Sequence, residues 1–216
     1  MSIKKYLHSC LLLEKNGKRI LIDPGLFSFI EGRLKPQNIG EVDAILITHK
    51  HADHFDPAIL KKFLSCKPTQ IYTIEEIGSL LQQDGIEYER VKPGDSLTIE
   101  GFQVDVFDAP HGKLPVPVPD NVAFLVDHVL HPGDSFSPVG IDSCDVLALP
   151  IAGPWATLSS AIELVDRLHP RHVIPIHDAI IKDFMLTRIY ELMLKPLLEE
   201  KHIAFHPLGL GVAVEV

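Results

Sequence analysis

The chain has 216 residues, of which 46% are hydrophobic and 23% charged, so disorder and collagen-like repeats are excluded. This length favours one compact domain over residues 1–216 rather than two. Twenty Lys and Arg against 29 Asp and Glu give a net charge of −9. Such a charge supplies no overall attraction to nucleic acid or to anionic membranes, so we expect neither as a partner.

The cysteines are few and give no metal-binding or disulfide pattern. Cys10, Cys66 and Cys144 form no CxxC pair, which argues against a disulfide framework and a cysteine-rich zinc site. The N-terminal apolar run contains His8, ends at Glu14 and is too short for the core of a signal peptide. No stretch approaches 18 consecutive apolar residues, so we expect a cytoplasmic protein.

A hairpin opens the chain. Apolar runs at 11–13 and 19–22 flank Asn16 and Gly17, and both of these residues tolerate the positive φ of a type I′ turn. Residues 44–48 then form a buried-strand pattern that runs directly into a cluster of histidines.

The rest of the chain predicts strands interspersed with helices. Asp56 is a favourable N-cap and Pro57 a favourable first helical residue, so a helix is expected to begin there. Residues 26–40 and the proline-rich 113–120 are expected to be loops that shape a pocket. Helices in both halves suit an α/β (α+β) fold whose sheets are covered outside by helices. Further strands are expected at 70–73, 96–100, 102–109, 122–127, 129–131, 146–149 and 172–176, further helices at 75–83, 158–168 and 184–199, and two short strands at the end.

The histidine cluster is the main chemical feature of the sequence. His49, His51, Asp53 and His54 place three imidazoles and one carboxylate within six positions. Their spacing follows neither the helix nor the strand period, so a loop can spread these side chains around one or two ions. Imidazole and carboxylate are suitable ligands for Zn²⁺ and for harder or redox-active first-row metals, so the cluster predicts a metal site.

More candidate residues follow other predicted strands. His111, Asp134 and His177 each come directly after one, and Asp23 ends the second strand of the opening hairpin. Functional sites are commonly built from loops at one edge of a rigid sheet, so these residues are candidates for the same site.

These residues, in this order, resemble the metallo-β-lactamase superfamily of metal-dependent hydrolases, and the resemblance extends from Asp23 to His177. Residues 7–10 (LHSC) and 150–153 (PIAG) resemble the small hydrolases related to ascorbate-phosphate lactonases. The resemblance implies a four-layer αββα sandwich with a dinuclear metal site at the edges of the sheets.

The resemblance also implies a role for each candidate. Two divalent ions are expected, Zn or Mn, with Fe as an alternative. His8 stays open between a contact to substrate, a proton donor and a buried core histidine. In the implied site the first ion is held by His49, His51 and His111, and the second ion is held by Asp53, His54 and His177. Asp134 bridges the two ions, and Asp23 orients the ligands by hydrogen bonds.

The implied chemistry is hydrolysis of a small substrate. Two ions about 3.5–4 Å apart can share a hydroxide, lower its pKa and polarise a carbonyl or phosphoryl oxygen. Asp53 is expected to orient that hydroxide or take its proton. The expected function is cleavage of an ester, lactone or phosphoester bond, and the charge of the metal ions admits anionic substrates despite the acidic composition.

Two alternatives use the same ligands: an iron-dependent redox enzyme similar to the persulfide dioxygenases, and a non-catalytic metal-binding protein. A nuclease is disfavoured because the chain has no basic stretch.

Other residues lie near the motif without a clear role. Trp155 and Phe136 are expected to pack in the core rather than line a substrate pocket. Lys50, Lys113 and Lys182 could hold a phosphate, but lysines on loops are usually solvated. The sequence leaves the oligomeric state open.

Overall fold

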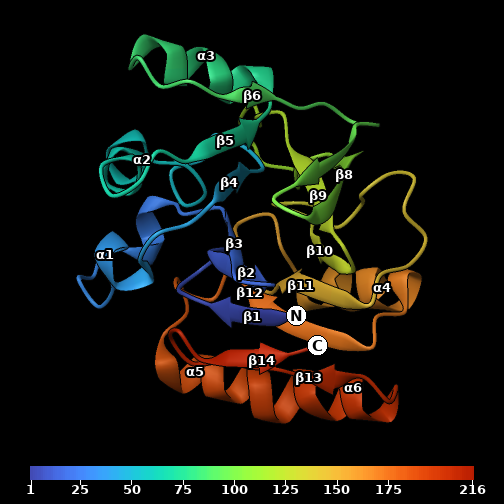
Figure 1. Cartoon of the computed structure of the whole chain (residues 1–216). Coiled ribbons are helices and arrows are strands. Elements are labelled where there is room, and N and C mark those ends of the chain that lie inside the picture. The colour runs from blue at the N-terminus through green and yellow to red at the C-terminus, as the bar shows by residue number, and fades with distance from the viewer.

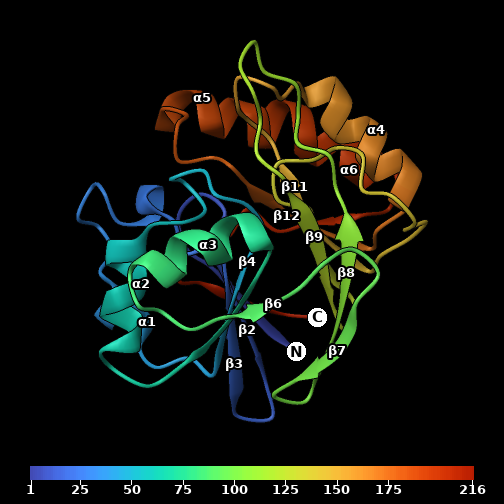
Figure 2. The same ribbon diagram turned by 90° about the horizontal axis from the view of Figure 1, so that it is seen from above.

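The computed structural model describes all of residues 1–216 as two seven-stranded sheets with helices on their outer faces. Figure 2 shows α1, α2 and α3 outside the first sheet and α4, α5 and α6 outside the second. The four-layer αββα arrangement is therefore confirmed. No helix in the structure combines the length and the apolar character needed to cross a membrane.

The first sheet contains the opening hairpin and the strand that leads into the histidine cluster. Its last strand pairs with its first, so the two ends of the chain lie side by side (Figure 1). Asn16 and Gly17 have φ of +53° and +75°, which confirms the predicted hairpin turn. In spatial order the strands are β14 (Ala213–Glu215), β1 (Ser2–Lys5), β2 (Leu11–Lys15), β3 (Lys18–Ile22), β4 (Ala44–Ile47), β5 (Gln70–Thr73) and β6 (Glu89–Arg90).

The second sheet contains the strands that precede the other candidate residues. β10, β11, β12 and β13 are parallel, and the remaining pairs are antiparallel. In spatial order the strands are β13 (Ala204–Phe205), β12 (His172–Ile176), β11 (Val146–Pro150), β10 (Val129–His131), β9 (Val122–Val126), β8 (Phe102–Asp108) and β7 (Ser96–Ile99).

The side chains of the second sheet alternate between two separate apolar cores. In β11, Val146 and Ala148 join the core between the sheets, whereas Leu147 and Leu149 join the core beneath the outer helices. Successive side chains of a strand point to opposite faces, so a strand covered on both faces is apolar throughout. This burial makes the sheets a rigid support for the loops at their edges.

Two of the helices begin after a residue whose side chain caps the first helical turn. Asp56 accepts a hydrogen bond from the Ile59 amide at 2.9 Å, which confirms the predicted N-cap. Thr157 accepts one from the Ser160 amide at 3.1 Å in the same way. The helices are α1 (Pro36–Ile39), α2 (Pro57–Leu64), α3 (Glu75–Gln83), α4 (Leu158–Leu168), α5 (Asp183–Arg188) and α6 (Lys195–Glu200).

Two segments differ from the expectation. The helix expected at 184–199 is present as continuous helical backbone from Asp183 to Glu200, but it contains a wider π-helical turn, η2 (Ile189–Leu194), between α5 and α6. Pro196 has no amide hydrogen and its ring crowds the preceding turn, which accounts for the wider winding there. The expected loop at 26–40 contains the short helix η1 (Leu26–Ser28) as well as α1, whereas 113–120 contains no helix or strand, as expected.

The candidate residues lie where strands of one direction end. β3 and β4 are parallel, and β8, β10 and β12 run in a common direction because β9 is antiparallel to both of its neighbours. The loops that follow these strands carry the candidate residues to a common edge of the two sheets. Residues far apart in the sequence thereby meet at one site.

Candidate metal centre

Two groups of side chains at the sheet edge could each hold a metal ion. Within each group, the potential ligand atoms all lie within 4.8 Å of one another. The first group comprises His49, His51, His111 and Asp134, and the second comprises His8, Asp53, His54 and His177.

In the first group, three imidazole nitrogens converge. His51 Nδ1 lies 3.2 Å from His49 Nε2 and 3.1 Å from His111 Nε2. Asp134 Oδ2 lies 3.7 Å from His49 Nε2 and 3.3 Å from His111 Nε2. The donor atoms are nitrogen and carboxylate oxygen, a set that suits Zn²⁺, Mn²⁺ and Fe²⁺.

In the second group, His54 Nε2 and His177 Nε2 are 2.8 Å apart. Asp134 Oδ1 lies 2.9 Å from the former and 2.6 Å from the latter. Asp53 Oδ2 lies 3.8 Å from His54 Nε2 and 3.0 Å from His8 Nε2. One carboxylate therefore faces both groups, with Oδ2 toward the first and Oδ1 toward the second.

The surroundings of Asp134 Oδ1 fit a bound cation. This atom is buried and makes no hydrogen bond, although two imidazole nitrogens lie within 3 Å of it. Two nitrogens and one carboxylate oxygen at such separations need a positive charge among them, which a proton on His54 supplies in the metal-free protein and a metal ion can supply instead. The residues present therefore fit a metal ion.

Asp23 fixes the orientation of His54. Asp23 Oδ1 accepts a hydrogen bond from the Thr48 amide at 2.8 Å, and Oδ2 accepts one from the Thr48 hydroxyl at 2.7 Å. His54 Nδ1 lies 2.7 Å from the same Oδ2, so it carries the proton and donates. The lone pair of His54 is then on Nε2, which points toward Asp134 and His177.

Burial and charge shift the pKa values of these groups in opposite directions. Burial lowers the pKa of His49 well below its ordinary value, and the nearby His54 charge adds to this shift. Burial also opposes charge on His54, but the Asp134 and Asp23 carboxylates outweigh it and raise the pKa of His54 well above its ordinary value. Burial raises the pKa of Asp134, but His54 and His177 outweigh it and hold this pKa well below its usual range.

The backbone at the site is held in unusual conformations. His8, Asp23 and His177 have φ of +60°, +49° and +65°, a region that non-glycine residues rarely adopt. Gly25 is required by close approach, since a Cβ there would lie 2.1 Å from the backbone of Asp53. Strained conformations of this kind concentrate at functional sites, where the surrounding structure supports them.

The model of a known family matches most of the chain. That family, described as the beta-lactamase superfamily domain, covers residues 2–177, which include every candidate ligand. The chain belongs to the metallo-β-lactamase superfamily.

Two curated proteins and a solved structure are similar to this chain. Protein Rv0786c of Mycobacterium tuberculosis is 34% identical over 84% of this chain and 85% of its own length. The metal-dependent hydrolase Ta0764 of Thermoplasma acidophilum is 28% identical over 79% of this chain and 80% of its own. Igni18, a metallo hydrolase of Ignicoccus hospitalis, shares the fold with a TM-score of 0.75 and 22% identity, covering 100% of this chain and 98% of that one. The chain is a metal-dependent hydrolase of the metallo-β-lactamase fold.

The metal centre of this superfamily member opens into a cavity of about 310 Å³. His8 lines this cavity with a fully buried side chain, and its Nε2 lies 3.0 Å from Asp53 Oδ2. Burial and the neighbouring His177 lower the pKa of His8 to about 4, so its ring is neutral at pH 7. The sequence left open whether His8 lies at the site or in the core, and in the structure it lies at the site.

Trp155 also lines the cavity, so the expectation that it only packs in the core was wrong. Its Nε1 donates a hydrogen bond to Asp134 Oδ2 at 3.0 Å. Phe136 packs against the Trp155 ring at 4.9 Å and stays outside the cavity, as expected. Only the fold of the superfamily brings the indole to Asp134, 21 positions away in the sequence.

We expect Trp155→Phe to lower the affinity for metal about 10–100-fold, because partners that orient a ligand carboxylate commonly contribute this much. The ring is retained, but Asp134 Oδ2 loses its indole donor. Competition with a chromophoric chelator measures the change. Phe136→Leu is the control, since it changes the packing beneath Trp155 and keeps the hydrogen bond. Equal affinities of the two variants would contradict the role of the indole.

Two residues that support the ligand segments were not predicted from the sequence. Asn121 Oδ1 accepts a hydrogen bond from the Asp134 amide at 3.3 Å, and its Nδ2 donates to the Ala109 carbonyl at 2.7 Å. His131 Nε2 donates to the Ser9 carbonyl at 2.9 Å, so this buried histidine ties the two sheets together. Neither residue belongs to a local motif, and the partners named here lie 12 to 122 positions away.

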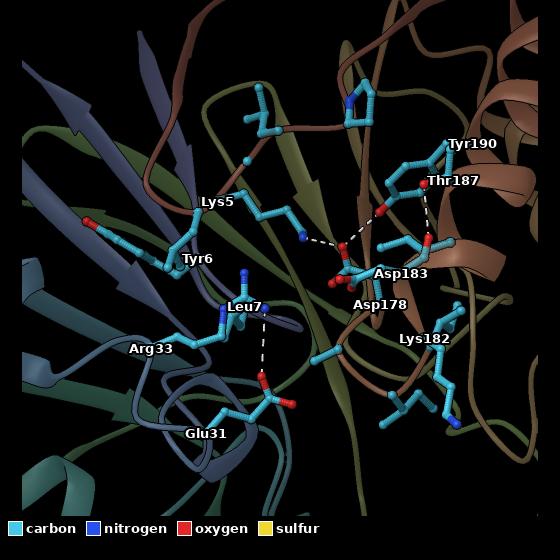
Figure 3. Close-up of a pocket in the computed structure, with 18 of the residues that line it drawn as sticks. Lys5, Tyr6, Leu7, Glu31, Arg33, Asp178, Lys182, Asp183, Thr187 and Tyr190 are labelled. Carbon is cyan, nitrogen blue, oxygen red and sulfur yellow. Dashed lines mark hydrogen bonds and ion pairs between the residues drawn. The ribbon is translucent and has the colours of Figure 1, made fainter.

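A buried ion pair joins the segments that carry His8 and His177. Lys5 Nζ donates to Asp178 Oδ2 at 2.5 Å, and the Tyr190 hydroxyl donates to the same oxygen at 2.7 Å. Figure 3 shows Lys5 and Tyr190 converging on Asp178 at one side of a second cavity of about 860 Å³. Because Asp178 directly follows His177 and Lys5 lies three residues before His8, this pair connects two walls of the metal centre.

We expect Lys5→Met to lower the free energy of unfolding by about 3–5 kcal/mol, because it leaves the buried Asp178 carboxylate without its cation. Urea unfolding measures this loss. Lys4→Met is the matched control, since the ion pair of Lys4 with Glu14 is solvent-exposed and should contribute at most about 1 kcal/mol. Equal stability of the two variants would show that the buried pair contributes nothing.

The lysines near the motif point away from the metal centre. Lys50 Nζ donates to Glu76 Oε1 at 2.7 Å, and Lys182 lines the 860 Å³ cavity. Lys113 is exposed and lines neither that cavity nor the one at the metal centre.

Proposed function

We propose that this protein hydrolyses an ester, lactone or phosphoester bond of a small substrate with two divalent ions, Zn or Mn. The observation that carries the proposal is the position of Asp134, whose two oxygens face the two groups of imidazole nitrogens. This arrangement supports Asp134 as the bridging ligand. We assign His49, His51 and His111 to the first ion and Asp53, His54 and His177 to the second.

When bound, the two ions would lower the pKa of a water molecule and polarise the oxygen of the bond to be cleaved. Asp53 lies beside this position, with a partly exposed side chain that lines the cavity. Its pKa is held below the usual range, because a hydrogen bond from His8 and the charge of His54 outweigh the effect of burial. Asp53 is therefore ionised and can orient the attacking water, whereas its lowered pKa makes it a weak proton acceptor.

His8 is placed to orient Asp53. Its neutral ring donates Nε2–H to Asp53, while Nδ1 is buried without a partner. Because Nε2 already carries the proton that it donates, we assign His8 to holding Asp53 in position within the cavity that both side chains line. Asp23 has the supporting role of holding His54 in one tautomer.

The test combines metal content with turnover. We expect the purified protein to bind two Zn or Mn ions per chain by elemental analysis and to hydrolyse generic esters, lactones or phosphodiesters only when loaded. His177→Ala should lose one ion and most of the activity. His128→Ala, a half-buried histidine away from the centre, should lose neither. Fewer than one ion per chain and no metal-dependent turnover would refute the proposal.

The same experiment distinguishes the alternatives. Iron as the dominant ion after expression without added metal would favour the redox enzyme. Two bound ions without turnover of any substrate would favour a non-catalytic metal-binding protein. A single hydrolase domain over residues 1–216, a cytoplasmic location and a place in the lactonase-like branch stay predictions from the sequence.

A further inference from the structure

The cavity at the metal centre has apolar walls. Beyond the histidines and carboxylates of the two ligand groups, it is lined by Phe27, Leu114, Gly153, Pro154, Trp155 and Ile180. The one polar atom among these side chains is the Trp155 indole nitrogen, which already donates to Asp134. The part of a substrate that does not react would therefore contact hydrocarbon and aromatic surface.

No lysine or arginine lines this cavity. Charged groups of a ligand are usually met by Arg or Lys side chains that form charge-assisted hydrogen bonds. Lys50 is paired with Glu76, and Lys182 belongs to the neighbouring cavity. A carboxylate or phosphate on the non-reacting part of a substrate would lose water here without gaining a partner, which is costly.

The cavity is also small, and Ile180 is one of its lining residues. A volume of about 310 Å³ is at the lower end of the range for ligand pockets, which is ~300–1,000 Å³. Ile180 lines both this cavity and the 860 Å³ cavity, with a side chain that is 50% exposed. The two cavities therefore adjoin at Ile180.

The larger cavity differs in its polarity. Figure 3 shows Arg33 paired with Glu31 and Lys5 paired with Asp178 around it. Lys182 also lines this larger cavity and forms no ion pair, so a free cation is present there but not in the cavity at the metal centre.

We propose that the substrate is an uncharged carboxylic ester or lactone with a short apolar acyl group, and that Ile180 sets the length of that group. This proposal rests on the proposed hydrolytic function and narrows its substrate class. The acyl chain would occupy the space beside Phe27, Leu114 and Ile180, and the carbonyl would face the ligand groups.

A matched pair of substrates tests the charge preference. p-Nitrophenyl pentanoate and mono-p-nitrophenyl glutarate have acyl chains of equal length, but only the second ends in a carboxylate. We expect the Zn- or Mn-loaded protein to prefer the pentanoate by about tenfold or more in kcat/KM, and to prefer it similarly over bis(p-nitrophenyl) phosphate. Faster hydrolysis of either anionic substrate would overturn this inference and leave the hydrolytic function standing. Hydrolysis of none of them would count against the function itself.

A binding measurement gives a readout that does not depend on turnover. Trp155 is the one tryptophan of the chain and lines the cavity, so its fluorescence reports on occupancy. We expect pentanamide to change this fluorescence in a saturable way and glutaramic acid, which adds a terminal carboxylate, to change it much less. An equal response to both would overturn the charge preference.

Replacing Ile180 tests the length limit. We expect wild type to favour p-nitrophenyl butyrate over the decanoate, and Ile180→Ala to shift this ratio about tenfold toward the decanoate by joining the two cavities. Val116→Ala is the control, because Val116 is exposed on the proline-rich segment and lines neither cavity. An unchanged ratio in Ile180→Ala, with metal content as in wild type, would overturn the role of Ile180.

Discussion

Asp134→Asn should reduce bound metal from two ions per chain to fewer than one and lower kcat/KM by more than ~100-fold. Losing a residue that merely orients a ligand costs about 10–100-fold, and Asp134 faces both ligand groups directly. The amide that replaces it has nearly the same shape but no charge to offset two divalent ions. Elemental analysis and steady-state kinetics measure the two effects.

The matched control for this substitution is Asp142→Asn. Asp142 is exposed in the loop that precedes β11, so its variant should keep full metal content and activity. Circular dichroism of both variants separates loss of metal from loss of fold. An Asp134→Asn protein that keeps two ions and near-wild-type turnover would exclude Asp134 as the bridging ligand.

Asp23→Asn should lower the free energy of unfolding by about 3–5 kcal/mol and remove one of the two metal ions. The fully buried Asp23 carboxylate accepts from the Thr48 amide, the Thr48 hydroxyl and His54 Nδ1. An asparagine offers one acceptor oxygen, so at least one of these buried donors is left unsatisfied. His54 belongs to the second ligand group alone, so the first ion should be retained.

Urea unfolding and elemental analysis of the same preparation test both effects of Asp23→Asn. Asp166→Asn is the control, because Asp166 forms a solvent-exposed ion pair with Lys201 that contributes at most about 1 kcal/mol. Loss of both ions together would mean that Asp23 supports the whole site rather than His54. An unchanged stability would contradict the hydrogen-bond network.

Much of the fold could be predicted because it depends on local patterns. The hairpin at Asn16 and Gly17 and the helix that begins after Asp56 follow from turn and cap chemistry within a few residues. The π-helical turn between α5 and α6 was not predicted, although Pro196 is visible in the sequence. A proline inside an apolar helical pattern can be accommodated by several kinds of distortion, and packing selects one.

The ligand groups could also be predicted from the sequence, because their residues follow strands that end at a common edge and their order matches a known superfamily. The sequence by itself thus determined the fold class and proposed as ligands seven of the eight residues in the two candidate groups, His8 being the exception. It could not reveal that Trp155 donates to Asp134 or that Lys5 pairs with Asp178, 173 positions away. Such partners are selected by packing between distant segments, which leaves no periodic trace in the chain.

The surroundings of the site were decided only by the tertiary structure. The lysines beside the motif are close to the ligands in sequence, yet their side chains point to Glu76, to solvent or to the neighbouring cavity. Closeness in the sequence brings the backbone of a residue near the site. The direction of its side chain depends on the turn that carries it and on the residues that it contacts. The types of ligand residue can therefore be predicted from the sequence, whereas the apolar walls of the cavity are determined by the tertiary structure.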